Sequence, residues 1–519
     1  MRRVFRSIAL CLCAALLLCS CEQPDPQPTP SGTPAPTPTA APQPARFSLG
    51  YDPAASLHPI TGDSQVNQEL TGLVYQGLYE LDNTFAPQPV LAVDASVSED
   101  DLTWTFTLTG GAVFSDGTPL APWHVTASLN QARTSSLYAA RLAGVTAVTA
   151  GEDAVTVTLS EPNGNLPALL DIPIALEQGP GSDGTAPPAP LGTGYYQYAR
   201  IEDRLCLQVN PHHPSAAALP YDTVFLTPVS DTEERIAAFD SGEISAVITD
   251  FSSPYALGYS GGYEVTDYPT TSLLYVGFQT AGGVCQSPLV RQAFSRAFDR
   301  TELVEIQFSG HGDPAALPVS PLSGEYSEAH AALLEYDPDA AAQLLAQAGY
   351  TVNEEDGLLY DRYTPVEVRL LVNSDNDVRQ AVARQLADAL AGLGVTVTVS
   401  HLPWSDFTAA LAAGQFDLYL GEVRLTGDFD PSVLLAGELN YGGFENEELA
   451  AALTRWRASQ GIWRTVAADL FWPQFVQDAP IASLCFKRGS LLMRWGIASN
   501  LQPTRANPYD QMEQWVVTE

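Results

Sequence analysis

The stretch that decides the fold is residues 94–133, which read DASVSEDDLTWTFTLTGGAVFSDGTPLAPWHVTASLNQAR. Apolar and polar residues alternate from Leu102 to Leu108, and this period of two predicts a half-buried strand. After a glycine turn, a short second strand is predicted at Val113 and Phe114, followed by a turn that contains Gly117. A helix then begins near Pro122, because proline suits the first helical position. The apolar face of this helix carries Val125, Leu129 and Ala132.

The same stretch resembles the signature of the family 5 extracellular solute-binding proteins, the oligopeptide, dipeptide and nickel receptors of ABC importers. Residues 102–106 read LTWTF and residues 114–119 read FSDGTP, as in the family. The chain departs from the family at Thr109, where a basic residue is usual, and at His124, where Asp is usual. Similar motifs recur along the chain, for example LGTGYY at 191–196. The resemblance implies an α/β fold of the two-lobed, type II periplasmic-binding-protein kind, with an extra subdomain in the first lobe.

The amino-terminal residues predict export and lipid anchoring. Residues 1–21 combine a basic start with an apolar run too short to span a bilayer, as in a signal peptide. The run ends Leu-Cys-Ser-Cys, which resembles a bacterial lipobox with Cys21 as the lipidated residue. The alternative is an ordinary secretory signal with incidental cysteines. Residues 22–46 are rich in Pro and Thr and are expected to form an extended tether.

Composition and motifs exclude several classes of function. The formal net charge of −36 repels phosphate backbones, so we expect no nucleic-acid partner. No H-E-x-x-H or G-x-S-x-G motif occurs, and the adjacent pair His212-His213 is a poor metal site because neighbouring extended residues point opposite ways. We therefore predict a protein without metal, cofactor or catalysis. Buried thiols are expected at Cys206, Cys285 and Cys485, with one disulfide left open.

The segments are expected to divide between two lobes. The resemblance implies a first lobe made of residues 47–269 and 483–519, with an inserted subdomain at 81–190, and a second lobe made of residues 270–482. Hydrophobic spacing predicts helices over residues 66–79, 231–241, 287–308, 336–350 and 377–393, and strands over residues 366–371 and 395–399. The last two strands and the helix between them form a βαβ unit.

Two places in the second lobe are candidates for ligand binding. Trp404 matches a Trp that flanks the ligand in peptide-binding relatives. Residues 421–431 resemble the family loop whose first Asp pairs with the peptide ammonium group, and here either Glu422 or Asp428, or neither, takes that role. Arg424 is unexpected in this loop. A guanidinium there can bind a carboxylate, or it can pair with Glu422 or Asp428.

The resemblance implies a binding protein rather than an enzyme. We expect a monomer, anchored at Cys21, that captures a small solute, most simply a short peptide, and delivers it to an ABC permease in the cell membrane. The alternatives are an extracellular lipoprotein hydrolase, a binder of a nickel chelate or an oligosaccharide, and an adhesion or scaffold protein. An adhesion protein would expose a large apolar patch and enclose no cleft.

Overall fold

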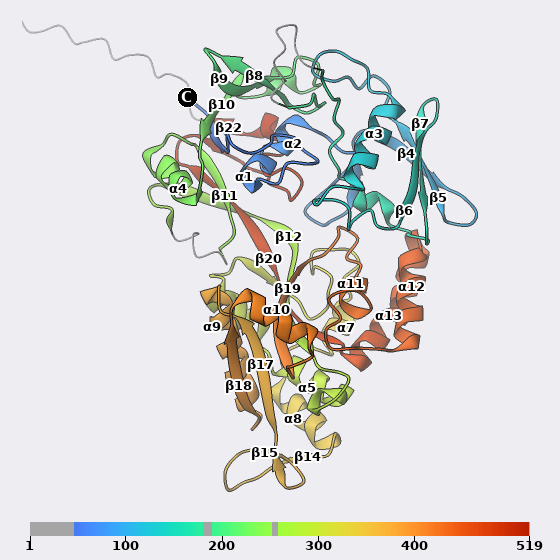
Figure 1. The fold of residues 1–519 in the computed structure, drawn as a ribbon, viewed down its shortest axis with the longest axis vertical. Coiled ribbons are helices and arrows are strands. Elements are labelled where there is room, and N and C mark those ends of the chain that lie inside the picture. The colour runs from blue at the N-terminus through green and yellow to red at the C-terminus, as the bar shows by residue number, and fades with distance from the viewer. Residues whose placement is uncertain (1–45, 180–188, 252–257, 518–519) are drawn as a thin grey trace, which may run out of the picture. The chain divides into compact units, whose positions relative to one another are not determined.

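The computed structural model describes residues 46–179, 189–251 and 258–517 (Figure 1). The predicted signal peptide and most of the predicted tether lie outside these residues. The described chain mixes helices and strands, as the sequence predicts. Among the described residues, no helix is both long and apolar enough to cross a membrane.

A mixed sheet forms the centre of the fold, with strand order β11-β20-β12-β19-β17-β18. Its parallel part is the predicted βαβ unit, in which Val368 pairs with Val397. A further short strand, β13, pairs with β20. The strands are β11 (Ala246–Thr249), β12 (Tyr263–Phe278), β13 (Gly312–Pro314), β17 (Glu367–Asn373), β18 (Thr396–Leu402), β19 (Leu418–Arg424) and β20 (Ile481–Arg494).

The two long strands β12 and β20 join different parts of the fold, and we call them the crossing strands (Figure 1). The second half of β20 pairs with β11, for example Leu492 with Val247. The first half of β20 pairs with the far end of β12, whose other edge carries β19. A register irregularity lies between Pro269 and Leu273 of β12. Such irregularities bend strands and re-aim side chains.

The remaining strands form separate small sheets. One has the order β1-β10-β9-β8 and another the order β4-β5-β7-β6, which contains the predicted strand of the opening stretch. The strands are β1 (Ser48–Tyr51), β2 (Tyr79–Leu81), β3 (Pro87–Pro89), β4 (Ala92–Val97), β5 (Thr103–Leu108), β6 (Val145–Ala150), β7 (Ala154–Leu159), β8 (Tyr196–Ile201), β9 (Arg204–Val209), β10 (Thr223–Pro228), β14 (Tyr350–Val352), β15 (Leu359–Asp361), β16 (Thr364–Pro365), β21 (Ala498–Ser499) and β22 (Val516–Val517).

Several helices begin at a capping side chain. Asp231 accepts a hydrogen bond from the backbone of Glu234 at the start of α4, and Asp337 does the same for Ala340 at the start of α8. The helices are α1 (Gln65–Gln68), α2 (Thr71–Val74), α3 (Pro122–Ala132), α4 (Thr232–Ser241), α5 (Pro288–Ala297), α6 (Arg300–Gln307), α7 (Glu328–Ala331), α8 (Pro338–Gln347), α9 (Asp377–Ala391), α10 (Trp404–Ala412), α11 (Ser432–Leu435), α12 (Glu447–Ala458) and α13 (Gly461–Asp478).

Separate hydrophobic cores support these sheets. One packs Phe47, Tyr196 and Trp515 around the β1 sheet, and another packs the opening strand and helix of the 94–133 stretch. Two more cores lie mostly on residues 270–486, on the two faces of the central sheet. One of these also takes in Phe85, so the segment after β2 packs against residues far along the chain.

Two predicted elements are wrong, and the cysteines are as expected. Val113 forms only an isolated bridge with Pro119, because the turn between them leaves no length for a ladder. The predicted helix over 66–79 is two short helices, α1 and α2, and then the strand β2. Cys206, Cys285 and Cys485 are buried free thiols.

Candidate functional site

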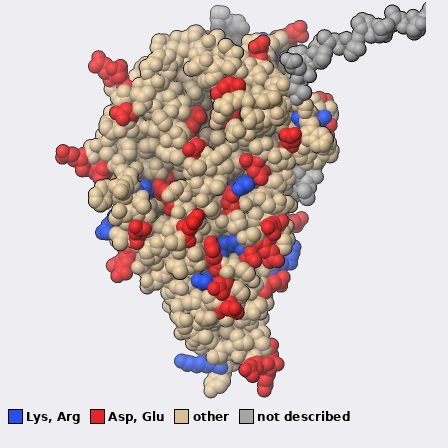
Figure 2. Space-filling model, turned by 180° about the vertical axis from the view of Figure 1, so that it is seen from behind, with Lys and Arg blue, Asp and Glu red and all other residues tan. Residues whose placement is uncertain are grey.

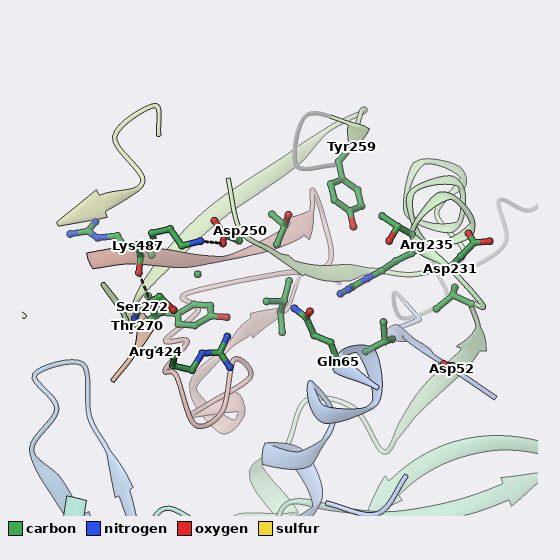
Figure 3. A pocket seen from close by; sticks show the side chains of 18 of the residues that line it. Asp52, Gln65, Asp231, Arg235, Asp250, Tyr259, Thr270, Ser272, Arg424 and Lys487 are labelled. Carbon is green, nitrogen blue, oxygen red and sulfur yellow. Dashed lines mark hydrogen bonds and ion pairs between the residues drawn. The ribbon is translucent and has the colours of Figure 1, made fainter. Parts of the chain in front are cut away.

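A cavity of about 510 Å³ lies beside the crossing strands (Figure 3). This volume falls in the range of roughly 300–1,000 Å³ that is usual for small-molecule sites. Its lining combines residues from strands that are far apart in the sequence with the start of α4 and with α1. The lining residues used below are Asp52, Gln65, Asp231, Arg235, Asp250, Tyr259, Tyr268, Thr270, Ser272, Arg424, Lys487, Arg488 and Gly489.

Strand register brings these residues together. Arg424 ends β19 opposite Ser272 of β12, and Tyr268 of β12 lies opposite Gly489 of β20. The irregular part of β12 is held by Thr270, whose hydroxyl donates to the carbonyl of Lys487 at 2.5 Å and accepts from the backbone N–H of Ser272 at 3.1 Å. The bend in β12 therefore helps to shape the cavity wall.

Arg424 lines the cavity with an exposed side chain (Figure 3). Within the described ranges, no hydrogen bond or ion pair reaches its guanidinium group. The predicted alternative, a pair with Glu422 or Asp428, does not form, because both carboxylates have other partners. Arg424 does interact electrostatically with Tyr268 and Arg505.

Glu422 is held by two cations and is not among the lining residues. Its Oε2 lies 2.7 Å from Nη2 of Arg379, and its Oε1 lies 2.8 Å from Nζ of Lys487. Lys487 also contacts Asp250 at 2.7 Å. The negative charge of Glu422 is therefore already balanced inside the protein.

Asp428 is buried away from the cavity lining, at 4% exposure. Its Oδ2 accepts from Nδ2 of Asn163 at 3.0 Å, and its Oδ1 accepts from the hydroxyl of Thr426 at 2.5 Å. Burial and the charge of Asp428 together raise the pKa of the neighbouring Asp430, although Arg457 opposes the rise. The carboxylates of Glu422 and Asp428 thus both hold the 421–431 loop to the residues around it.

Trp404 begins α10 and is also outside the cavity lining. Trp404 is 55% exposed, and its ring lies tilted to that of Phe407, with 5.9 Å between the ring centroids. Its backbone N–H donates to Asp375 at 3.1 Å. A role for Trp404 in ligand contact stays a prediction.

Several lining residues escaped sequence reasoning. Arg235 of α4 is buried and forms a bidentate pair with Glu69, at 3.1 and 2.5 Å. Tyr259 lines the same part of the cavity (Figure 3). Burial raises the pKa of Tyr268, so its hydroxyl stays neutral. The one sequence feature that pointed to this lining was Lys487, because it is the single lysine of the sequence.

His212 and His213 lie outside the cavity lining. Among the described residues, no group of three or more His, Cys, Asp or Glu side chains is arranged to hold a metal ion. His213 instead packs edge-on against Tyr195, with 4.6 Å between the ring centroids.

Residues 86–441 match the family model of the bacterial extracellular solute-binding proteins, family 5. The glutathione-binding protein GsiB of Salmonella paratyphi A is 31% identical over 312 residues, covering 57% of this chain and 59% of that protein. The match thus spans less than two thirds of that relative's length.

Solved structures share the fold. The unliganded open form of MppA, a periplasmic murein tripeptide binding protein, matches with a TM-score of 0.74 at 19% identity over 92% of this chain and 98% of that chain. A nickel ABC transporter structure from Bacillus halodurans matches with a TM-score of 0.72 at 19% identity over 91% of this chain and 99% of that chain. The fold is therefore the two-lobed type II kind that the sequence predicts.

Proposed function

Because this chain belongs to the bacterial extracellular solute-binding proteins of family 5, we propose that it captures a small solute in the cavity beside the crossing strands and delivers it to an ABC permease. The solute we propose is a short peptide. The observation that carries the proposal is a cavity whose wall combines strands β11, β12, β19 and β20 with α4. When the two lobes of a hinged clamp close, the strands that run between them change conformation.

The chemistry of the lining supports a peptide. Gln65 supplies an amide, while Tyr259 and Tyr268 supply hydroxyl groups, and Arg424 supplies a charge. Peptide ligands present amide donors and acceptors together with charged termini, so such a mixture can match them. Relatives support the same class, because one is a glutathione-binding protein by name and one solved structure is a tripeptide-binding protein.

The proposed clamp has the lobes expected from the sequence. The first would comprise residues 47–269 and 483–519, with the insertion at 81–190, and the second residues 270–482. Solute would enter between them and be released unchanged. Trp404 would contact the solute only if α10 approaches it on closure.

Titration calorimetry against pooled unblocked peptides of two to five residues tests the peptide proposal. We expect saturable heat with at least one pool and unchanged peptides after incubation, measured by mass spectrometry. No heat with any peptide, together with heat on adding a nickel–histidine complex or an oligosaccharide, would overturn the peptide and favour those solutes. Cleaved peptides would favour the hydrolase alternative.

We also propose that Cys21 carries a lipid and that residues 22–46 tether a monomeric body to the outer face of the cell membrane. The support is the lipobox-like sequence before Cys21. Substitution Cys21→Ser is expected to move the protein from the membrane pellet to the soluble fraction after cell fractionation. The matched control is Cys19→Ser, which leaves the modified position intact. Equal membrane retention of both variants would contradict the anchor.

A further inference from the structure

We infer that the solute carries a carboxylate and that Arg424 binds it, which for a peptide means its carboxyl terminus. This inference rests on the function proposed above, and it adds the chemical class of the solute and the residue that selects it. It reverses the expectation that an acidic residue of the 421–431 loop reads an ammonium group.

The cations that line the cavity are matched by acids, with Arg424 as the exception. Arg235 is paired with Glu69. Lys487 is paired with Glu422 and Asp250. Arg488 contacts Asp313 at 2.5 Å. Among the described residues, only the guanidinium of Arg424 is left in the lining without a carboxylate or a hydrogen-bond acceptor.

A second group of cations lies close to Arg424. Asp171 is buried between the guanidinium groups of Arg141 and Arg505, so two cations share one carboxylate. Burial, together with the positive charge of Arg424, lowers the pKa of Arg505. The chain as a whole carries 60 acidic residues against 24 Lys and Arg, and Figure 2 shows acidic side chains spread over the rear face. Asp171 is thus held by Arg141 and Arg505 and forms no bond with Arg424.

The acids near the cavity are already engaged. Asp52 accepts from the backbone N–H of Ala54 at 2.9 Å, and Asp231 caps α4 by accepting from Glu234 at 2.8 Å. Asp250 is paired with Lys487. Asp52 and Asp231 each keep a second carboxylate oxygen that a solute ammonium could meet, and acetylated peptides test that contact, whereas a solute carboxylate meets the unpaired guanidinium of Arg424.

Geometry allows Arg424 to act on a bound solute. The residue ends β19, and the next residue is held in the sheet by the hydrogen bond from the Leu425 N–H to the Thr271 carbonyl, at 3.0 Å. Its backbone is thus fixed while its side chain reaches the cavity (Figure 3). A planar guanidinium can bind a carboxylate through two parallel hydrogen bonds, which a neutral amide cannot match.

The test compares three pools of peptides of two to five residues by titration calorimetry: unblocked, amidated at the carboxyl terminus, and acetylated at the amino terminus. For the wild-type protein we expect the amidated pool to bind about 10–100-fold more weakly than the unblocked pool, as is typical when a charge-assisted hydrogen bond is lost. In Arg424→Gln this preference should disappear. The variant should melt at the wild-type temperature, because the side chain has no partner to lose.

Arg369→Gln is the matched control. Arg369 is an exposed arginine on β17 of the same sheet, outside the cavity lining, and its substitution changes the net charge equally. The control should keep the preference for free carboxylates. Equal binding of amidated and unblocked pools by the wild type, or a preference that survives in Arg424→Gln, would overturn the inference and leave the proposed function standing. Loss of binding on acetylation alone would also overturn it, by assigning recognition to an acid. Failure of all three pools to bind the wild type would overturn the peptide function itself, and the inference with it.

Discussion

At the scale of single residues, Asp428 connects parts of the chain that are distant in sequence. Its carboxylate holds Asn163, which lies 265 residues earlier. We expect Asp428→Ala to lower the free energy of unfolding by about 1–3 kcal/mol, because the amide of Asn163 would lose its acceptor. Chemical denaturation measures this loss, and calorimetry should show a loss of peptide affinity no larger than that of Phe85→Ala, because the Asn163–Asp428 bond joins the same two segments as the Phe85–Phe429 contact. The control Glu438→Ala removes an exposed loop acid and should be neutral. A loss of affinity in Asp428→Ala much larger than that in Phe85→Ala, with unchanged stability, would return this residue to the ligand site.

Glu80 makes stability depend on pH. Burial, with the charges of Asp510 and Asp171, raises the pKa of its carboxyl from 4.5 to about 7. The folded chain therefore holds this proton more tightly than the unfolded chain, so ionisation costs nothing below pH 4.5 and costs progressively more as the pH rises to about 7. We expect Glu80→Gln to raise the free energy of unfolding by up to about 3 kcal/mol at pH 8 and to leave it unchanged at pH 4. Denaturant titrations at both values check this. An equal gain at both would show that ionisation is not the cause.

The sequence predicts which loop carries charged residues but not which partners those residues bind. Glu422 and Arg424 are two residues apart, which invites a pair between them, yet Glu422 binds Arg379 of α9 and Lys487 of β20. These partners come from other elements, and their proximity depends on strand register in the folded sheet. Spacing along a chain carries no information about such contacts, so Arg424 could be proposed but its lack of a partner could not.

At the scale of elements, sequence patterns succeed where local signals agree. Helix α8 has its capping Asp337 and Pro338 at its first position, and α9 has a long apolar face between two parallel strands. The segment 66–79 has helical spacing but becomes α1, α2 and β2. There the backbone N–H of Tyr79 bonds to the carbonyl of Leu170 instead of continuing a helix. A distant contact thus overrides a local pattern.

Gly489 on the crossing strand β20 makes room for the cavity wall. A Cβ atom at this position would lie 2.3 Å from Cζ of Tyr268 on β12. We expect Gly489→Ala to push the Tyr268 ring toward the cavity, to weaken peptide binding at least about tenfold, and to cost about 1–3 kcal/mol in stability. Gly282→Ala is the control, since a Cβ there meets no atom within 4 Å. Calorimetry and denaturation should separate the two variants. Wild-type affinity in Gly489→Ala would mean that Tyr268 does not bound the solute.

At the scale of the whole molecule, the segment 81–190 makes contacts that reach well beyond its own core. The backbone N–H of Gly164 donates to the carbonyl of Arg457 at 2.7 Å. Phe85 packs edge-on against Phe429, with 4.7 Å between the ring centroids. Leu81 and Ala168 share the same core with residues of 270–482. If the two proposed lobes move relative to each other about the crossing strands, the contacts between the segment 81–190 and residues 270–482 must form and break as they move.

A contact present only in the closed state of a clamp raises the apparent affinity for the solute, because it favours the state that holds it. We expect Phe85→Ala to weaken peptide binding at least about tenfold although Phe85 is outside the cavity lining. Small-angle scattering should show a smaller decrease of the radius of gyration on adding peptide than in the wild type. Phe298→Ala is the matched control, because this ring is also buried and belongs to a core formed by residues 274–485, with no member from the segment 81–190. It should lose about 3–5 kcal/mol of stability and keep its affinity. If Phe85→Ala loses stability alone, the contact is permanent, and the segment 81–190 moves as one body with residues 270–482.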